Sequence, residues 1–154
     1  MRVFLICVAS VLIAAGCGTI AQSEPAAVPM PTLEAVDTAM ITYGVELYRY
    51  YYCGTCHTLS AANTRGTFGP NHDAAGLNAT QYIGLDNYAG NATTAFEYLR
   101  ESILNPQVFY TPGFVGTNHN MPAFTNLSDA ELDAIVYLLL HQIDAAAVQR
   151  AQSQ

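Results

Sequence analysis

No other part of this 154-residue chain limits its possible folds as strongly as residues 53–57, which read Cys-Gly-Thr-Cys-His. Two cysteines three positions apart, followed at once by a histidine, form the attachment signature of c-type haem. Each thiol adds to one vinyl group of the porphyrin, and one helical turn between Cys53 and Cys56 matches the separation of the two vinyls. His57 would then lie under the iron as the proximal ligand. The motif therefore predicts one haem c, bound covalently through Cys53 and Cys56.

The same cysteines could instead belong to a zinc knuckle or to a redox-active Cys-x-x-Cys pair. A structural zinc site requires two further Cys or His ligands, and the only other cysteines, Cys7 and Cys17, lie in the N-terminal leader. A thioredoxin-like pair requires a βαβ setting, which the pattern of this chain lacks. Haem attachment is the stronger interpretation.

The N-terminus has the layout of a secretory signal. Arg2 precedes an apolar run that ends in small residues just before Cys17. This end resembles a bacterial lipobox, so we expect residues 1–16 to be a signal peptide and Cys17 to be lipidated. The alternative is an uncleaved anchor at residues 3–20, about the minimum length of a transmembrane helix. Both interpretations place the rest of the chain on the outer (periplasmic) face of a bacterial cytoplasmic membrane.

The composition of residues 17–154 predicts a tether, one domain and a tail, and the charge of the chain limits its partners. Residues 17–36 are rich in proline and lack hydrophobic periodicity, which predicts a flexible tether. Residues 37–147 would form one domain, followed by a C-terminal tail at 148–154. The whole chain has 12 acidic residues against five arginines and no lysine, with a net charge of −7. Nucleic acid is excluded as a partner, because binding a phosphate backbone requires clustered basic side chains.

A first helix is predicted from Asp37 towards the cysteine motif. Apolar side chains recur along it at helical spacing. Gly44 lowers helix propensity there by about 1 kcal/mol relative to alanine, and such a glycine usually indicates close approach by another element. The apolar positions are Ala39, Met40, Tyr43, Leu47 and Tyr48.

Two later helices open with capping boxes, in which Ser or Thr is followed three residues later by Glu. One is predicted from Thr94 to Leu104 with Phe96 on its apolar face, and the other from the Ser128 cap to Leu140. A shorter helix at about residues 80–86 is possible. No strand pattern competes, so the expected fold class is all-α, with helices packed around one haem.

Met121 is the predicted sixth ligand of the iron. It lies in an irregular stretch before the last helix, and Pro122 fixes the backbone beside it. The other thioethers are Met30, in the tether, and Met40, in the first helix. His119 is the rival, and bis-histidine ligation would lower the reduction potential. A weak or absent sixth ligand would instead open the iron to small molecules.

Residues 68–71, Phe-Gly-Pro-Asn, are predicted to support the proximal histidine. A ligating histidine nearly always donates its other ring N–H to an acceptor. The carbonyl of Pro70 is the candidate, because the proline ring stiffens this loop; a plain turn is the alternative. His72 and His141 are interpreted as ordinary surface or helix-end residues.

Several motifs follow one another along the chain: Gly44 and Tyr48, Cys53 to His57, Gly69-Pro70-Asn71, Asn105-Pro106, Met121-Pro122-Ala123-Phe124, and Tyr137 in the last helix. Because it carries these motifs, the region of about residues 43–142 resembles a class I (monohaem) cytochrome c. The resemblance implies that the first and last helices cross near-perpendicularly, with Gly44, Tyr48 and Tyr137 at the contact. It also implies a haem buried except for one edge. Many members ring that edge with lysines; this chain has none, so its contact surface is expected to be apolar or to meet a basic partner.

The resemblance further implies a one-electron carrier rather than an independent enzyme, and no catalytic acid–base pair or nucleophile is visible. Such a cytochrome would pass electrons between a quinol-oxidising complex and a terminal oxidase or reaction centre. It could act as a tethered shuttle or as a fixed subunit of a large complex, such as alternative complex III. The alternative function is a haem-based gas-binding or peroxidase-like protein with a labile sixth ligand.

Overall fold

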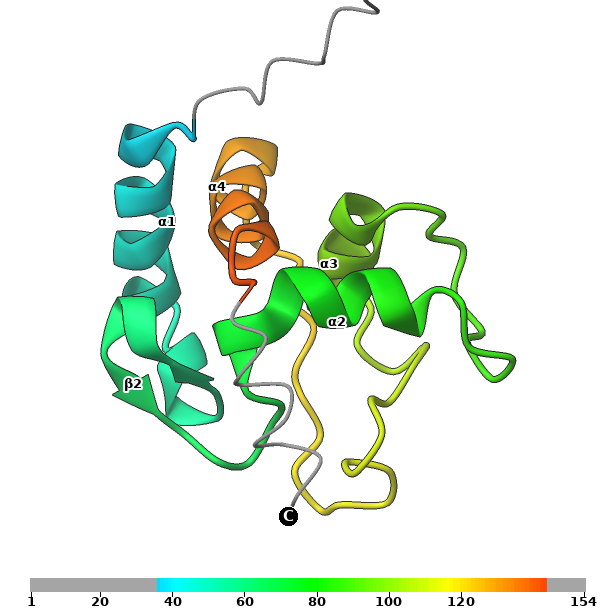
Figure 1. The fold of residues 1–154 in the computed structure, drawn as a ribbon. Helices are drawn as coiled ribbons and strands as arrows, with labels where there is room; N and C mark the ends of the chain where they lie inside the picture. Colours follow the sequence, from blue (N-terminus) through cyan, green and yellow to red (C-terminus); the bar gives the residue numbers. More distant parts are fainter. Residues whose placement is uncertain (1–35, 144–154) are drawn as a thin grey trace, which may run out of the picture. The chain divides into compact units, whose positions relative to one another are not determined.

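The computed structural model describes residues 36–143, which form four α-helices, three short 3-10 turns and one two-stranded ladder (Figure 1). The predicted signal peptide, the Cys17 lipidation site, almost all of the tether and the C-terminal tail lie outside these residues. The helices are α1 Thr38–Tyr50, α2 Ala75–Tyr82, α3 Ala95–Leu104 and α4 Asp129–Leu140. The strands are β1 Thr58–Leu59 and β2 Thr64–Arg65, and the 3-10 turns are η1 Cys53–Thr55, η2 Ser60–Ala62 and η3 His72–Ala74.

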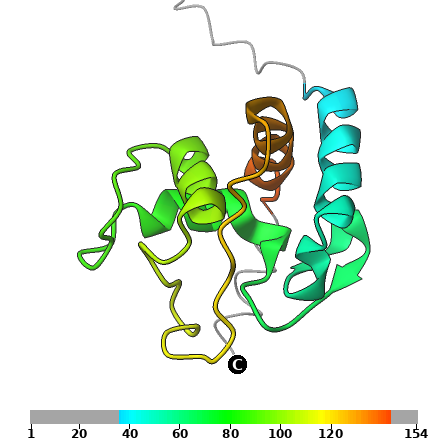
Figure 2. The ribbon, with the colours of Figure 1, turned by 180° about the vertical axis from the view of Figure 1, so that it is seen from behind.

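Helix α1 packs against α4 at Gly44, and Figures 1 and 2 show the two helices side by side from opposite directions. A Cβ atom at Gly44 would lie 2.4 Å from the Ala134 carbonyl oxygen and 2.8 Å from Leu138 Cβ. The close approach predicted at this glycine is confirmed. Tyr137 lies nearer the beginning of α1, where its hydroxyl accepts a hydrogen bond from the Asp37 N–H at 2.9 Å.

Polar side chains cap three helices, two of them with the capping boxes that the sequence predicted. Both capping boxes are present: Thr94 with Glu97 at the start of α3, and Ser128 with Glu131 at the start of α4. The Asp37 carboxylate caps α1 by accepting from two backbone N–H groups of its first turn, at 2.9 and 3.1 Å. These caps satisfy N–H groups that a helix start leaves without internal partners.

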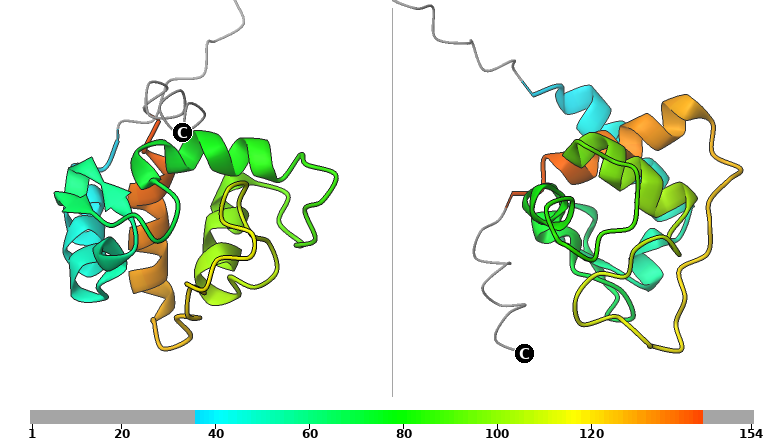
Figure 3. Two further views of the ribbon diagram at one scale, coloured as in Figure 1. Left: turned by 90° about the horizontal axis from the view of Figure 1, so that it is seen from below. Right: turned by 90° about the vertical axis from the view of Figure 1, so that its right-hand side faces the viewer.

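Helix α2 was only partly predicted, since it begins at Ala75 rather than near residue 80. Its start is fixed by packing rather than by apolar periodicity. A Cβ at Gly76 would lie 2.1 Å from the Leu140 carbonyl oxygen, and the Gly76 N–H donates to the Gln142 carbonyl at 3.0 Å. Figure 3 accordingly shows α2 starting beside the last turn of α4.

The β1–β2 ladder departs from the expectation of helices alone. It pairs Thr58 with Arg65 and Leu59 with Thr64 in antiparallel register. Asn63 adopts the left-handed conformation, with φ 52°, in the connection between the strands. Two residues per strand are too few for alternating hydrophobicity to be seen in the sequence.

Two aromatic residues that the periodicity placed on buried faces are substantially exposed. Phe96 is 37% exposed and Tyr43 is 43% exposed. The Arg100 guanidinium lies 5.9 Å from the centre of the Phe96 ring. Arg100 also pairs with Asp129 at 3.0 Å and with Asp133, so its polar contacts join α3 to α4 along an exposed edge.

The core is built from all four helices, together with Leu59 of β1 and Ala62 of η2. Its largest fully buried side chains are Tyr48, Leu59, Leu132, Ile135, Val136 and Leu138. Within residues 36–143, none of the helices has the length and apolar character needed to cross a membrane.

Replacing Gly44 by alanine is expected to lower the free energy of unfolding by about 1–3 kcal/mol, the usual penalty for overpacking a core. The new methyl group would meet backbone of α4, which cannot swing aside as a side chain could. Gly84→Ala is the matched control, because its Cβ would lie 3.5 Å from the Gln81 carbonyl, an ordinary contact. Denaturant unfolding of both variants checks the prediction, and equal stability would contradict it.

Candidate haem-binding site

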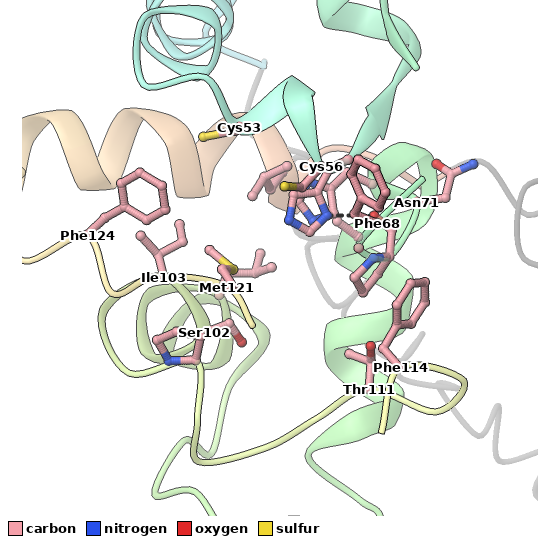
Figure 4. Close-up of a pocket in the computed structure, with 18 of the residues that line it drawn as sticks. Cys53, Cys56, Phe68, Asn71, Ser102, Ile103, Thr111, Phe114, Met121 and Phe124 are labelled. Atoms are coloured by element: carbon pink, nitrogen blue, oxygen red, sulfur yellow. Dashed lines mark hydrogen bonds between the residues drawn. The ribbon is translucent and has the colours of Figure 1, made fainter. Parts of the chain in front are cut away.

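Residues from the segment after α1, the loop at 68–72 and the irregular stretch before α4 line a cavity of about 710 Å³ (Figure 4). Its wall is mostly apolar. Cofactor and ligand pockets typically measure about 300–1,000 Å³. The predicted haem-site residues come from three separate segments of the chain, and all of them line this cavity: Cys53, Cys56, His57, Pro70 and Met121.

The cysteines are presented by an abrupt turn at the end of α1. Tyr52 takes the left-handed conformation, with φ 57°, and the chain then closes the η1 turn. Glycine is the usual residue where a helix ends this way, and another residue there costs about 1–3 kcal/mol. Cys53 and Cys56 are free and half-buried, and burial raises the pKa of the Cys53 thiol to about 11.

His57 is buried, at 5% exposure, and it contacts the loop that follows. Its Nδ1 lies 2.8 Å from the Pro70 carbonyl oxygen, so the expected hydrogen bond is present. With Nδ1–H donating there, Nε2 keeps its lone pair for a metal. Burial lowers the pKa of His57, against the opposing effect of the Pro70 hydrogen bond, and so favours the neutral imidazole that a metal requires.

Gly69 is needed where the loop passes His57. Its N–H donates to the Cys56 carbonyl at 2.9 Å. A Cβ at Gly69 would lie 2.4 Å from His57 Cε1, so no larger residue fits there without moving the ring. The Gly-Pro pair therefore combines a close approach with a carbonyl acceptor, which is more than a plain turn.

His72 was interpreted as an ordinary surface or helix-end residue; it does begin the η3 turn, but it is not an ordinary surface side chain. Its ring is stacked on the His57 ring, with centres 4.0 Å apart and planes within 15°. Its Nδ1 lies 3.1 Å from the hydroxyl of Tyr48, the most deeply buried tyrosine. Burial lowers the pKa of His72 well below its usual range, and the neighbouring His57 adds to the effect.

A buried carboxylate holds the His72 turn in place. The Asp73 carboxylate accepts from the Ser60 backbone N–H at 2.6 Å and from the Ser60 hydroxyl at 2.9 Å. Asn71 accepts from the Asp73 N–H at 2.8 Å and so caps η3. This network ties the loop beside His57 to the segment after β1.

Met121 lies across the cavity from the two cysteines and beside Ile103 (Figure 4). It is half-buried and packs against the hydrophobic core. Gln107 donates to the Met121 carbonyl at 3.0 Å, which anchors the backbone. His119 also lines the cavity but is exposed, and its ring lies against Phe68 with centres 4.4 Å apart. This placement favours Met121 over His119 as a ligand.

A porphyrin fits the chemistry of this wall. Among residues 36–143, one buried side-chain polar atom has no hydrogen-bond partner, Thr111 Oγ1, and Thr111 lines the cavity. A buried hydroxyl without a partner costs about 1–3 kcal/mol, so the site is suited to a ligand that carries acceptors. Haem combines a large apolar ring with two propionate carboxylates, which are acceptors of this kind.

Comparisons with protein-family models, curated proteins and solved structures found no match. In the described part of the chain, no group of three or more His, Cys, Asp or Glu side chains is placed to hold a metal ion.

Proposed function

We propose that the protein is a monohaem c-type cytochrome of class I fold that carries one electron at a time. The observation that supports this is the convergence of Cys53, Cys56, His57 and Met121 on one mostly apolar cavity. When bound, haem supplies the ferric–ferrous couple. In this proposal, bond making is limited to the attachment of the haem to the two cysteine thiols.

Each residue has a separate task in this proposal. The cysteine thiols form thioethers that prevent loss of the cofactor. His57 Nε2 and the Met121 sulfur would bind the iron, and the Pro70 carbonyl accepts the hydrogen bond from His57 Nδ1–H that leaves Nε2 free for this role. A thioether ligand and a dry, apolar wall both favour ferrous iron and so raise the reduction potential.

The partners are proposed to be redox proteins of a membrane electron-transport chain, reached from a lipid anchor at Cys17. Tyr52 and Phe68 line the cavity and are 79% and 50% exposed. They provide apolar contact area beside the site in a chain without lysine. This favours a partner that recognises an apolar face over an acidic partner that would be attracted by lysines on this chain.

The test is production of the full chain together with a c-type haem maturation system. We expect one haem that stays bound in a denaturing gel, a reversible one-electron redox change, and no rapid binding of carbon monoxide by the ferrous form. Absence of covalent haem would overturn the proposal. Rapid carbon monoxide binding would favour the gas-binding or peroxidase-like alternative.

Native membranes dissolved in mild detergent would distinguish the two modes of action. If covalent haem and this chain migrate with a large assembly, the protein is a fixed subunit. Migration near monomer size indicates a tethered shuttle.

A further inference from the structure

The cavity is lined by a second histidine, His72, that has no role as an iron ligand in the proposed function. His72 is not one of the proposed iron ligands, and its ring is stacked on the His57 ring with centres 4.0 Å apart. It is not a surface residue either, since its Nδ1 meets the Tyr48 hydroxyl at 3.1 Å. Binding of the iron by His57 therefore does not explain why His72 is stacked against it.

The Pro70 hydrogen bond alone does not fix the plane of the His57 ring. It sets one distance, from Nδ1 to the carbonyl oxygen, and the ring can still tilt about the line from Cβ to Nδ1. A flat neighbour in parallel contact opposes that tilt, and side-chain contacts of this kind orient metal ligands. The stacked ring of His72 is such a neighbour.

Tyr48 holds the His72 ring in position. The Tyr48 ring meets the His72 ring edge-on, with centres 5.9 Å apart at 71°, and Tyr48 is fully buried in α1. The backbone on the other side is fixed by the Asp73 contacts to Ser60. His72 thus transmits the rigidity of α1 and of the η3 turn to the His57 ring.

We propose that His72 is a positioning residue, which sets the plane of the proximal His57 ring through its stacked imidazole and the Tyr48 hydroxyl. This inference rests on the proposed function, because it concerns the ligand of a bound haem. The orientation of an axial imidazole governs the splitting of the iron d orbitals, which electron paramagnetic resonance and the shifted NMR lines of the haem methyl groups report. Those signals would not respond to a purely structural role.

The experiment compares the haem-loaded His72→Leu, His72→Phe and Tyr48→Phe variants with the unchanged protein. We expect His72→Leu to retain its covalent haem and to show displaced ferric resonance signals and a changed reduction potential. His72→Phe keeps a flat ring and should stay close to the unchanged protein, and Tyr48→Phe should fall between. His141→Leu is the matched control, because His141 is also partly buried beside an aromatic ring, Tyr137, with centres 4.2 Å apart.

Unchanged signals in His72→Leu, or equal displacement in His72→Phe and His72→Leu, would overturn the inference. If the leucine variant fails to fold, the unchanged protein still decides: one fixed ring plane predicts a single set of haem methyl lines, and several sets would contradict it. Failure of the proposed function is distinguishable, because the unchanged chain would then carry no covalent haem.

Discussion

Replacing Cys53 and Cys56 together by alanine is expected to abolish gel-stable haem completely and to destabilise the domain. Without thioethers, the cofactor would be held only by axial and apolar contacts along a cavity of about 710 Å³. We expect the unfolding midpoint to fall by at least about 10 °C, since about 1 kcal/mol shifts the midpoint by about 4–8 °C in a domain of this size. Haem staining of a denaturing gel and thermal unfolding followed by circular dichroism check both parts.

The single variants and a leader cysteine supply the controls. Cys53→Ala and Cys56→Ala each leave one thiol able to form a thioether, so reduced but detectable covalent haem is expected. Cys7→Ala removes a cysteine far from the motif in sequence and should leave haem attachment unchanged. Gel-stable haem in the double variant would show that the attachment assigned to these thiols is wrong.

The features that could be predicted from the sequence are those set by residues a few positions apart. The capping boxes that open α3 and α4 are fixed by residues three positions apart. The close approach at Gly44 could be predicted because a glycine inside a strong helix pattern usually indicates contact with another element. The structure shows that contact at Ala134. The haem motif is equally local.

What could not be predicted depends on where distant segments meet. Nothing adjacent to His72 in the sequence indicates Tyr48, which lies 24 residues earlier, so a stacked histidine looked like a surface one. Thr111 has no local signal at all, because its significance is a lack of partners in the folded protein. Asn71, a helix-capping residue type just before His72, was the one available hint that a turn and not free surface begins there.

The left-handed conformation of Tyr52 is a further feature that the sequence does not indicate. Helix-ending residues in this conformation are usually glycine, so the sequence offered no reason to end α1 so sharply before Cys53. The structure keeps the tyrosine, 79% exposed, beside the cysteines. The conformational cost at this position accompanies the placement of the proposed haem-binding segment, and strained backbone is often found at functional sites.

Replacing Met121 by alanine is expected to open one axial position of the iron while leaving the haem covalently bound. Alanine has no sulfur to coordinate, and the anchored backbone at Met121 offers no other donor from the same position. The ferrous form should then bind carbon monoxide rapidly. The reduction potential should fall by on the order of 0.1 V, within the range of about 0.8 V that axial ligands span. Carbon monoxide difference spectra and a redox titration measure the two effects.

Met40→Ala is the matched control, because Met40 is a thioether in α1 that packs against the core. It should lower stability through lost packing, by about 2–5 kcal/mol at a fully buried site and less at this partly buried one, without opening the iron. If Met121→Ala left both the potential and the closed site unchanged, His119 would become the ligand to replace. His119 would first have to leave its contact with Phe68. A His119→Ala variant that alone opened the iron would therefore show that the structure changes around the bound haem, and that Met121 only fills the wall.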